Sequence, residues 1–171
     1  AEYFRAAFNA VQTIEKNGFA LAGHDVSAGG LVTCLLEMCF SNTKGGLNVS
    51  LDAFAEKDLL KILFAENPAV VLQVANANLD AVKKILESGV AYVALGKPVA
   101  ERTIKIEKDG KTVNLDIDEL RDEWYETSYR LDTKQSFNGC AEERFKNYKN
   151  IPLDIKYPDH FKGTLASLGL D

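Results

Sequence analysis

The sequence predicts an α+β fold, with about six strands and five helices inside residues 2–131. Three observations predict it. Apolar residues recur at helical spacing in several segments, and short apolar runs bounded by glycine, asparagine or proline lie between those segments. The third observation is Asp109-Gly110, which stands between two strand-like runs and is a strong hairpin signal.

The first half of the chain predicts two helix–strand pairs. Phe4, Phe8 and Ile14 share one apolar face of a helix over residues 2–17, and Asn17-Gly18 predicts where that helix ends. The elements expected next are a strand over 19–25, a helix over 28–41, a strand over 47–51 and a short helix over 58–64.

The second half predicts a βαβ unit, complete or split. A strand over 69–74, a helix that begins at Asn76 or Asn78 and a strand over 90–95 follow one another with short joints, and Gly96-Lys97-Pro98 would end the last strand. The hairpin over 103–107 and 112–116 comes next, followed by a helix over 117–131 with Trp124 facing inward.

The periodic pattern ends near Asp132. Residues 133–150 are polar with scattered aromatics, and residues 151–171 contain two prolines and no sustained period. We therefore expect one domain over residues 1–131 and a linker or wrapping arm over residues 132–171. The chain begins without methionine, so we expect it to be a piece of a longer or processed protein.

Composition excludes several classes of function. The net charge of −5 argues against a nucleic-acid or anionic-membrane partner, and no apolar run is long enough to span a membrane. Cys34 and Cys39 fall in an apolar helical run and are expected to be buried, reduced thiols. That use of cysteine is typical of a cytoplasmic protein.

The most informative stretch is residues 23–31, where an apolar run gives way to a helix through a polar hinge. Ser27 is the expected N-cap, and Ala28, Gly29 and Gly30 would form a first turn that leaves room for a phosphate. Asp25 would add the carboxylate that a Mg²⁺–nucleotide needs. The alternative is ordinary turn chemistry without a ligand.

Other polar residues give weaker signals. His24 could donate a hydrogen bond to a ligand or be a structural histidine, and Glu66 could turn towards a ligand or be a solvated loop acid. Glu37 is expected to be a surface acid and His160 to be solvated. A zinc site, a P-loop and a nucleophilic serine elbow are not indicated. No complete catalytic constellation can be assembled from these residues.

Residues 24–31 read HDVSAGGL and resemble the H-D-V-S-x-G-G-L motif of the phosphoribosylformylglycinamidine synthase family. Residues 36–38 (Leu-Glu-Met), 63–66 (Leu-Phe-Ala-Glu) and 124–131, which read WYETSYRL, are also similar to that family. The resemblance covers nearly the whole chain, and the two main motifs lie in the family's order.

The resemblance implies a three-layer α/β/α sandwich with a mixed sheet, partly ferredoxin-like, as in the C-terminal subdomain of aminoimidazole ribonucleotide synthetase-like enzymes. It implies that Asp25 binds Mg²⁺ and that Ser27, Gly29 and Gly30 contact ATP or ADP. The implied partners are an N-terminal synthetase-like subdomain and a glutaminase domain that follows the arm. The implied reaction is the ATP- and glutamine-dependent conversion of formylglycinamide ribonucleotide to its amidine in purine biosynthesis, and this piece alone would be inactive.

Two alternatives stay open at this point. The chain could belong to a related ATP-using enzyme of the selenophosphate synthetase or thiamine-monophosphate kinase type. It could instead be a non-catalytic binding module in which the Gly29-Gly30 turn is only structural. The sequence also leaves open whether the nucleotide site is catalytic or holds a structural ADP.

Overall fold

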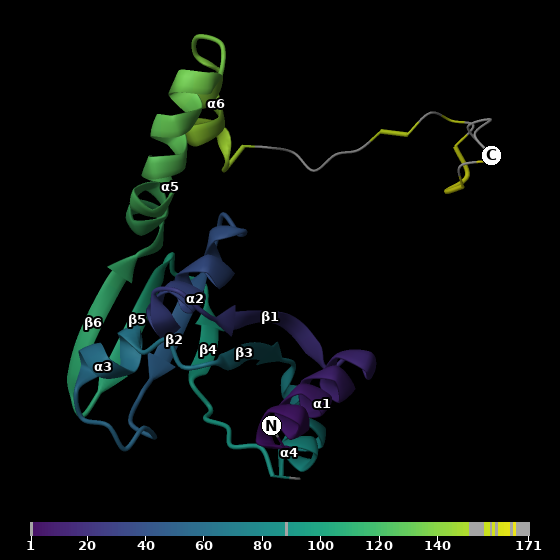
Figure 1. The fold of residues 1–171 in the computed structure, drawn as a ribbon, viewed down its shortest axis with the longest axis vertical. Coiled ribbons are helices and arrows are strands. Elements are labelled where there is room, and N and C mark those ends of the chain that lie inside the picture. Colours follow the sequence, from purple (N-terminus) through teal and green to yellow (C-terminus); the bar gives the residue numbers. More distant parts are fainter. Residues whose placement is uncertain are drawn as a thin grey trace. The chain divides into compact units, whose positions relative to one another are not determined.

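The computed structural model describes residues 2–87, 89–150, 156–157, 159, 161–164 and 166. The chain forms two compact units, Ala1–Thr127 and Ser128–Asp171 (Figure 1). His160, expected to be solvated, lies outside the described residues.

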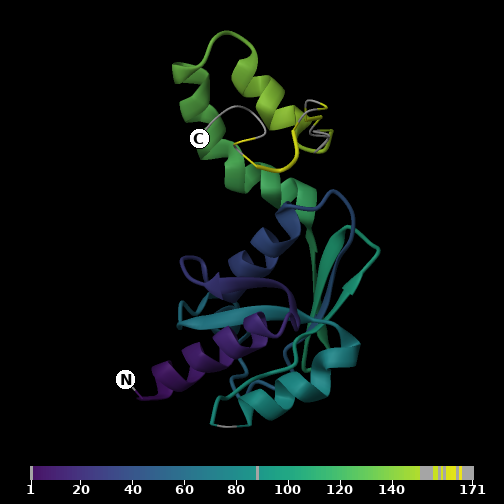
Figure 2. The same cartoon turned by 90° about the vertical axis from the view of Figure 1, so that its right-hand side faces the viewer.

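The first unit contains two sheets. Strands β1 (Ala20–Val26) and β3 (Ala69–Val74) pair antiparallel and lie side by side (Figures 1 and 2). The second sheet has the order β4-β2-β5-β6, formed by Gly96–Val99, Gly46–Ser50, Thr103–Lys108 and Lys111–Asp116. In this second sheet β2 and β5 are parallel while β4 and β6 pair antiparallel at the two edges. The predicted α+β class with a mixed sheet is confirmed.

Helix α2 (Gly30–Phe40) is at the centre of the hydrophobic core. Its apolar residues pack with those of β1, β2, β5, α3 (Leu59–Phe64) and the start of α5 (Ile117–Gln135). Four of the fully buried side chains of this core are branched aliphatic residues, which suit close packing between a helix and a sheet: Leu51, Ile104, Ile106 and Ile117. The two sheets and α2 therefore form one core, and β1 with its following turn is fixed against it.

Helices α1 (Glu2–Lys16) and α4 (Leu79–Leu86) lie against each other (Figure 1), and the short 3₁₀ helix η1 (Asn76–Asn78) leads into α4. Helix α1 ends as predicted, because Gly18 adopts φ +67° and the N–H of Phe19 donates to the carbonyl of Ile14. The predicted apolar face is only half covered: Ile14 is buried, whereas Phe4 and Phe8 are exposed.

The predicted strand over 90–95 is wrong. The strand begins at Gly96, the residue at which the predicted strand was expected to end. It is β4, and it pairs with β2 instead of with β3. The β2 backbone comes so close to Gly96 that a Cβ there would stand 1.9 Å from the carbonyl oxygen of Asn48. Pro98 is tolerated because β4 is an edge strand. The βαβ unit therefore does not form, since β3 and β4 belong to different sheets.

The second unit is more ordered than its sequence suggests. Helix α5 continues to Gln135, and α6 (Cys140–Asn147) follows in a segment for which no element was expected. Within this unit the Tyr129 and Phe145 rings stack 4.7 Å apart, and the Arg144 guanidinium binds both carboxylate oxygens of Asp132. These long-range contacts hold α6 in place, and no periodic pattern in the local sequence predicts them. The predicted course of residues 132–171 towards a glutaminase domain stays a prediction.

Candidate functional site

The β1–α2 turn is built by backbone contacts. Gly29, at φ +82°, precedes the first residue of α2, so the prediction of Ser27 as the N-cap is wrong. The N–H of Gly30 donates to the carbonyl oxygen of Ser27 at 3.0 Å, which closes the turn. The helix begins at Gly30, two residues later than the sequence suggested, because Ala28 and Gly29 lie in the turn.

Gly30 is required by packing. It adopts φ +74°, and a Cβ at this position would stand 2.6 Å from the carbonyl oxygen of Leu63 and 2.7 Å from the carbonyl carbon of Phe64. The end of α3 thus occupies the space that a side chain would need. A Cβ on Gly29 would meet the Thr33 hydroxyl at 2.3 Å. The predicted close approach at these glycines is made by the protein's own backbone and side chains, and their contact with a nucleotide stays a prediction.

Glu66 belongs to this turn. Its Oε1 accepts the N–H of Gly29 at 2.9 Å, although the two residues lie 37 positions apart in the chain. The Glu66 carboxylate therefore accepts the Gly29 N–H, one of the backbone donors expected from the sequence to bind a phosphate. Of the two interpretations of Glu66, the structure supports neither in its simple form: the side chain is exposed, yet it is held by the turn.

Asp25 and Ser27 flank the buried Val26 and are exposed. The Asp25 side chain is 71% accessible, and its backbone is paired with Val70 of β3. An exposed carboxylate fits Mg²⁺ as one ligand among phosphate oxygens and waters. Within the described part of the chain no group of three or more histidine, cysteine, aspartate or glutamate side chains could hold a metal ion by itself. Asp25 therefore offers one carboxylate donor.

His24 and Glu37 form a half-buried pair beside the turn. The His24 Nδ1 lies 2.8 Å from the carbonyl oxygen of Asp25, and because a carbonyl only accepts, Nδ1 carries a proton. The His24 Nε2 lies 3.4 Å from Glu37 Oε2, and the Trp124 indole N–H donates to Glu37 Oε1 at 3.1 Å. The structural interpretation of His24 is thus supported.

Two sequence-based expectations fail at this pair. Glu37 is not a surface acid, since its side chain is only 24% accessible. Trp124 does not face inward, because it is more than half exposed; its ring is tilted by 50° against that of Phe40, with the ring centroids 5.3 Å apart. One signal could have located Glu37: it follows Cys34 by three positions, which places it at the margin of the buried stripe of α2.

Neither Cys34 nor Cys39 has the properties of a nucleophile. Burial raises the pKa of the Cys34 thiol to about 11, and the nearby Asp25 and Glu37 carboxylates add to the shift. Burial also raises the pKa of Cys39, against a smaller lowering by Arg102. Both residues are buried and free, which confirms the prediction of reduced structural thiols.

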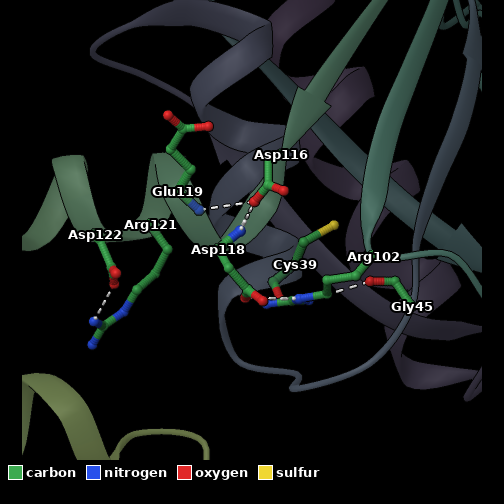
Figure 3. Close-up of polar contacts among 8 residues, drawn as sticks. All are labelled: Cys39, Gly45, Arg102, Asp116, Asp118, Glu119, Arg121 and Asp122. Carbon is green, nitrogen blue, oxygen red and sulfur yellow. Dashed lines mark hydrogen bonds and ion pairs between the residues drawn. The ribbon is translucent and has the colours of Figure 1, made fainter.

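Arg102 organises a separate polar cluster (Figure 3). Its Nη1 donates to the carbonyls of Cys39 and Gly45, and its Nε donates to Asp118 at 3.1 Å. Asp116 caps α5 by accepting the backbone N–H groups of Asp118 and Glu119. Because the Arg102 head group joins the end of α2, the following loop and the start of α5, we assign this cluster a structural role.

The chain is similar to known proteins over most of its length. A family model described as "AIR synthase related protein, C-terminal domain" matches residues 3–109. Human phosphoribosylformylglycinamidine synthase is 36% identical over 143 residues, which cover 80% of this chain and 10% of the human protein. The major tegument protein of Epstein-Barr virus (strain AG876) is 39% identical over 95 residues, 56% of this chain and 7% of the viral protein.

The fold also has a solved counterpart. The structure of T. maritima PurL complexed with ATP is similar with a TM-score of 0.58 at 15% identity, over 66% of this chain and 20% of that one. The described helices include none that is long and apolar enough to cross a membrane. The chain thus spans about a tenth of the human relative's length and shares the fold of part of PurL. From the family match over residues 3–109, the chain belongs to the family of AIR synthase related proteins and contains their C-terminal domain.

Proposed function

We propose that this chain is one domain of an ATP- and glutamine-dependent ligase that converts formylglycinamide ribonucleotide to formylglycinamidine ribonucleotide in cytoplasmic purine biosynthesis. The domain would contribute part of a Mg²⁺–nucleotide site. The observation that carries the proposal is the junction of β1 and α2, where Asp25 near the end of β1 and Ser27 in the turn are exposed next to two glycines held at positive φ. The 36% identity to human phosphoribosylformylglycinamidine synthase supports it.

In this proposal Asp25 would provide one carboxylate oxygen to Mg²⁺, and the Ser27 hydroxyl would contact the nucleotide. Mg²⁺, when bound, would neutralise and orient the phosphate groups. The ATP complex of T. maritima PurL, which has this fold, supports the choice of nucleotide. Glu66 would fix the turn through the Gly29 N–H, so an incoming phosphate would have to use other donors or displace its carboxylate.

The rest of the site would come from other domains of a longer chain, namely an N-terminal synthetase-like subdomain and a glutaminase domain. Exposed apolar side chains support such neighbours. Tyr3, Phe4 and Phe8 of α1 and Leu60 and Phe64 of α3 are each more than half accessible. Apolar surface of this kind is typical of a face that packs against another part of a protein.

The test is Asp25→Asn in the longer protein, with Asp80→Asn as the control. Asp80 is also an exposed aspartate, in the first turn of α4, and makes the same change of charge away from the turn. Since loss of an outer-shell partner alone costs about 10–100-fold in metal affinity, loss of a direct ligand should raise the half-saturating Mg²⁺ concentration for nucleotide retention at least tenfold. Equal Mg²⁺ dependence in the two variants would refute the assignment of Asp25.

A second candidate function, a non-catalytic binding module, is favoured by one observation. The viral relative, at 39% identity, carries a name that describes a tegument component and not an enzyme. A protein that retains the turn and the fold but neither binds Mg²⁺–nucleotide nor forms amidine would fit this candidate. The same measurement of nucleotide retention separates the two, because a purely structural turn predicts no Mg²⁺ dependence even in the unsubstituted protein.

A further inference from the structure

Glu37 joins three elements at one carboxylate. It lies on α2, its Oε2 is 3.4 Å from His24 Nε2 on β1, and its Oε1 accepts the indole N–H of Trp124 on α5 at 3.1 Å. Oε1 is engaged by a hydrogen bond, and Oε2 faces the His24 imidazole, with which it forms an ion pair in the protonated state of the ring. A carboxylate held at both oxygens has a fixed orientation, and so does each group that it holds.

The contact from Glu37 continues to Asp25. The other nitrogen of the same imidazole, Nδ1, donates to the carbonyl oxygen of Asp25 at 2.8 Å. The ring is mostly covered, with 31% of the side chain accessible, whereas 71% of the Asp25 side chain is accessible. The imidazole therefore contacts Asp25 twice, at its backbone carbonyl and at its carboxylate, whose Oδ1 lies 3.7 Å from Nδ1.

We propose that Glu37 is a positioning residue for Asp25: it holds the His24 imidazole, and through it the backbone of the β1–α2 turn, in the geometry that presents the Asp25 carboxylate. This inference rests on the proposed function, because it gives Glu37 a role at the same Mg²⁺–nucleotide site. Glu37 touches no ligand in this role. Trp124 is the second anchor, since its N–H and its packing on Phe40 hold the Glu37 carboxylate from the other side.

The chain offers well-matched variants. Glu37→Ala removes both contacts. Glu37→Gln keeps a carbonyl oxygen for the Trp124 N–H and can donate an amide N–H to the Nε2 of neutral His24. Trp124→Phe keeps an aromatic ring on Phe40 but removes the donor. Glu123→Gln is the control, because Glu123 is an exposed neighbour of Trp124 on α5 and undergoes the same loss of charge.

The functional experiment measures Mg²⁺-dependent retention of ADP in the longer protein. Glu37→Ala should raise the half-saturating Mg²⁺ concentration about tenfold, as loss of an outer-shell partner does. For Glu37→Gln the half-saturating Mg²⁺ concentration should lie within about threefold of that of the unsubstituted protein. For Trp124→Phe it should lie between the values of Glu37→Gln and Glu37→Ala. A residue that only stabilises the fold would lower the melting temperature and leave this concentration unchanged. An unchanged value for Glu37→Ala, equal to that of Glu123→Gln, would overturn the proposal.

A structural measurement on the 171-residue chain separates this proposal from the proposed function. Trp124 is its only tryptophan, so a ¹⁵N spectrum contains one indole N–H signal. That signal should shift in Glu37→Ala, shift less in Glu37→Gln and stay in place in Glu123→Gln. A signal unaffected by Glu37→Ala would overturn the contact and with it the positioning role. If the indole shift is found but the unsubstituted longer protein shows no Mg²⁺-dependent retention, the proposed function fails, and the role of Glu37 at that site fails with it.

Discussion

Replacing Gly30 with alanine separates two reasons for a glycine at the turn. The residue adopts φ +74°, where an alanine costs roughly 1–2 kcal/mol relative to the ordinary helical region. The added Cβ would also stand 2.6 Å from the carbonyl oxygen of Leu63, a backbone atom that cannot rotate away. Forcing an extra methyl group into packed structure costs about 1–3 kcal/mol.

These two costs are partly offset in the unfolded chain, where alanine has less conformational freedom than glycine by about 0.4–1 kcal/mol. The expected net loss for Gly30→Ala is therefore about 2–4 kcal/mol, a large part of the roughly 5–15 kcal/mol that stabilises a typical domain. Gly18→Ala is the matched control, because Gly18 has a similar φ of +67° with nothing within 4 Å of the added Cβ. It should lose only about 1 kcal/mol or less.

Urea unfolding of the 171-residue chain, followed by far-ultraviolet circular dichroism, measures both free energies. The difference between the two variants isolates the contribution of the close approach of α3 to Gly30. If Gly30→Ala and Gly18→Ala lose the same free energy of unfolding, the end of α3 does not hold the turn as closely as described, and the packing explanation for Gly30 is refuted.

Three further predictions concern thiols, buried charge and acid stability. In the native chain at pH 8, only the partly exposed Cys140 should react rapidly with a disulfide reagent, since Cys34 and Cys39 are buried with raised pKa values; fast reaction of all three thiols would contradict the described core. Arg102→Met should lower the free energy of unfolding by about 3–5 kcal/mol, measured in urea, because it removes a largely buried guanidinium that donates to the Asp118 carboxylate and to two carbonyls. The pKa of Asp52 is lowered by hydrogen bonds from the Asp109 N–H and the Ser50 hydroxyl, so the ionised carboxylate stabilises the fold at neutral pH. That stabilisation is lost as the pH falls below 3.8, the ordinary pKa of aspartate, and through the lower pKa of the folded state. Asp52→Asn should therefore flatten the loss of stability below about pH 4 in an acid titration of melting temperature, and an unchanged slope would contradict the assignment.

Local patterns predicted most of the elements of the first unit. The strand over 69–74 has the predicted bounds, and the hairpin around Asp109-Gly110 forms where the sequence places it. Such elements depend on neighbours in the chain, which a periodic pattern or a turn residue reveals. The failure at residues 90–99 has the opposite cause. Gly96 and Pro98 have low strand propensity, but pairing with β2 outweighs it.

The turn between β1 and α2 lies where the sequence predicts it, but the contacts within it were not predicted. Ser27 is exposed on the expected turn, and Asp25 is exposed in β1 two residues before it. The contacts that define the turn come from distant residues: Glu66 reaches Gly29 across 37 positions, and Trp124 reaches Glu37 across 87. A single sequence carries no signal for such pairs, because neither partner differs locally from a solvated side chain.

The pairing of β1 with β3 has a consequence for how the site is made during folding. The paired residues lie about 50 positions apart, so a long loop must close before the strand that carries Asp25 acquires its partner. During synthesis, the turn sequence therefore emerges well before residues 69–74 can hold it. A nascent or truncated chain that stops before β3 would contain every residue of the turn but not the strand that pairs with the backbone of Asp25.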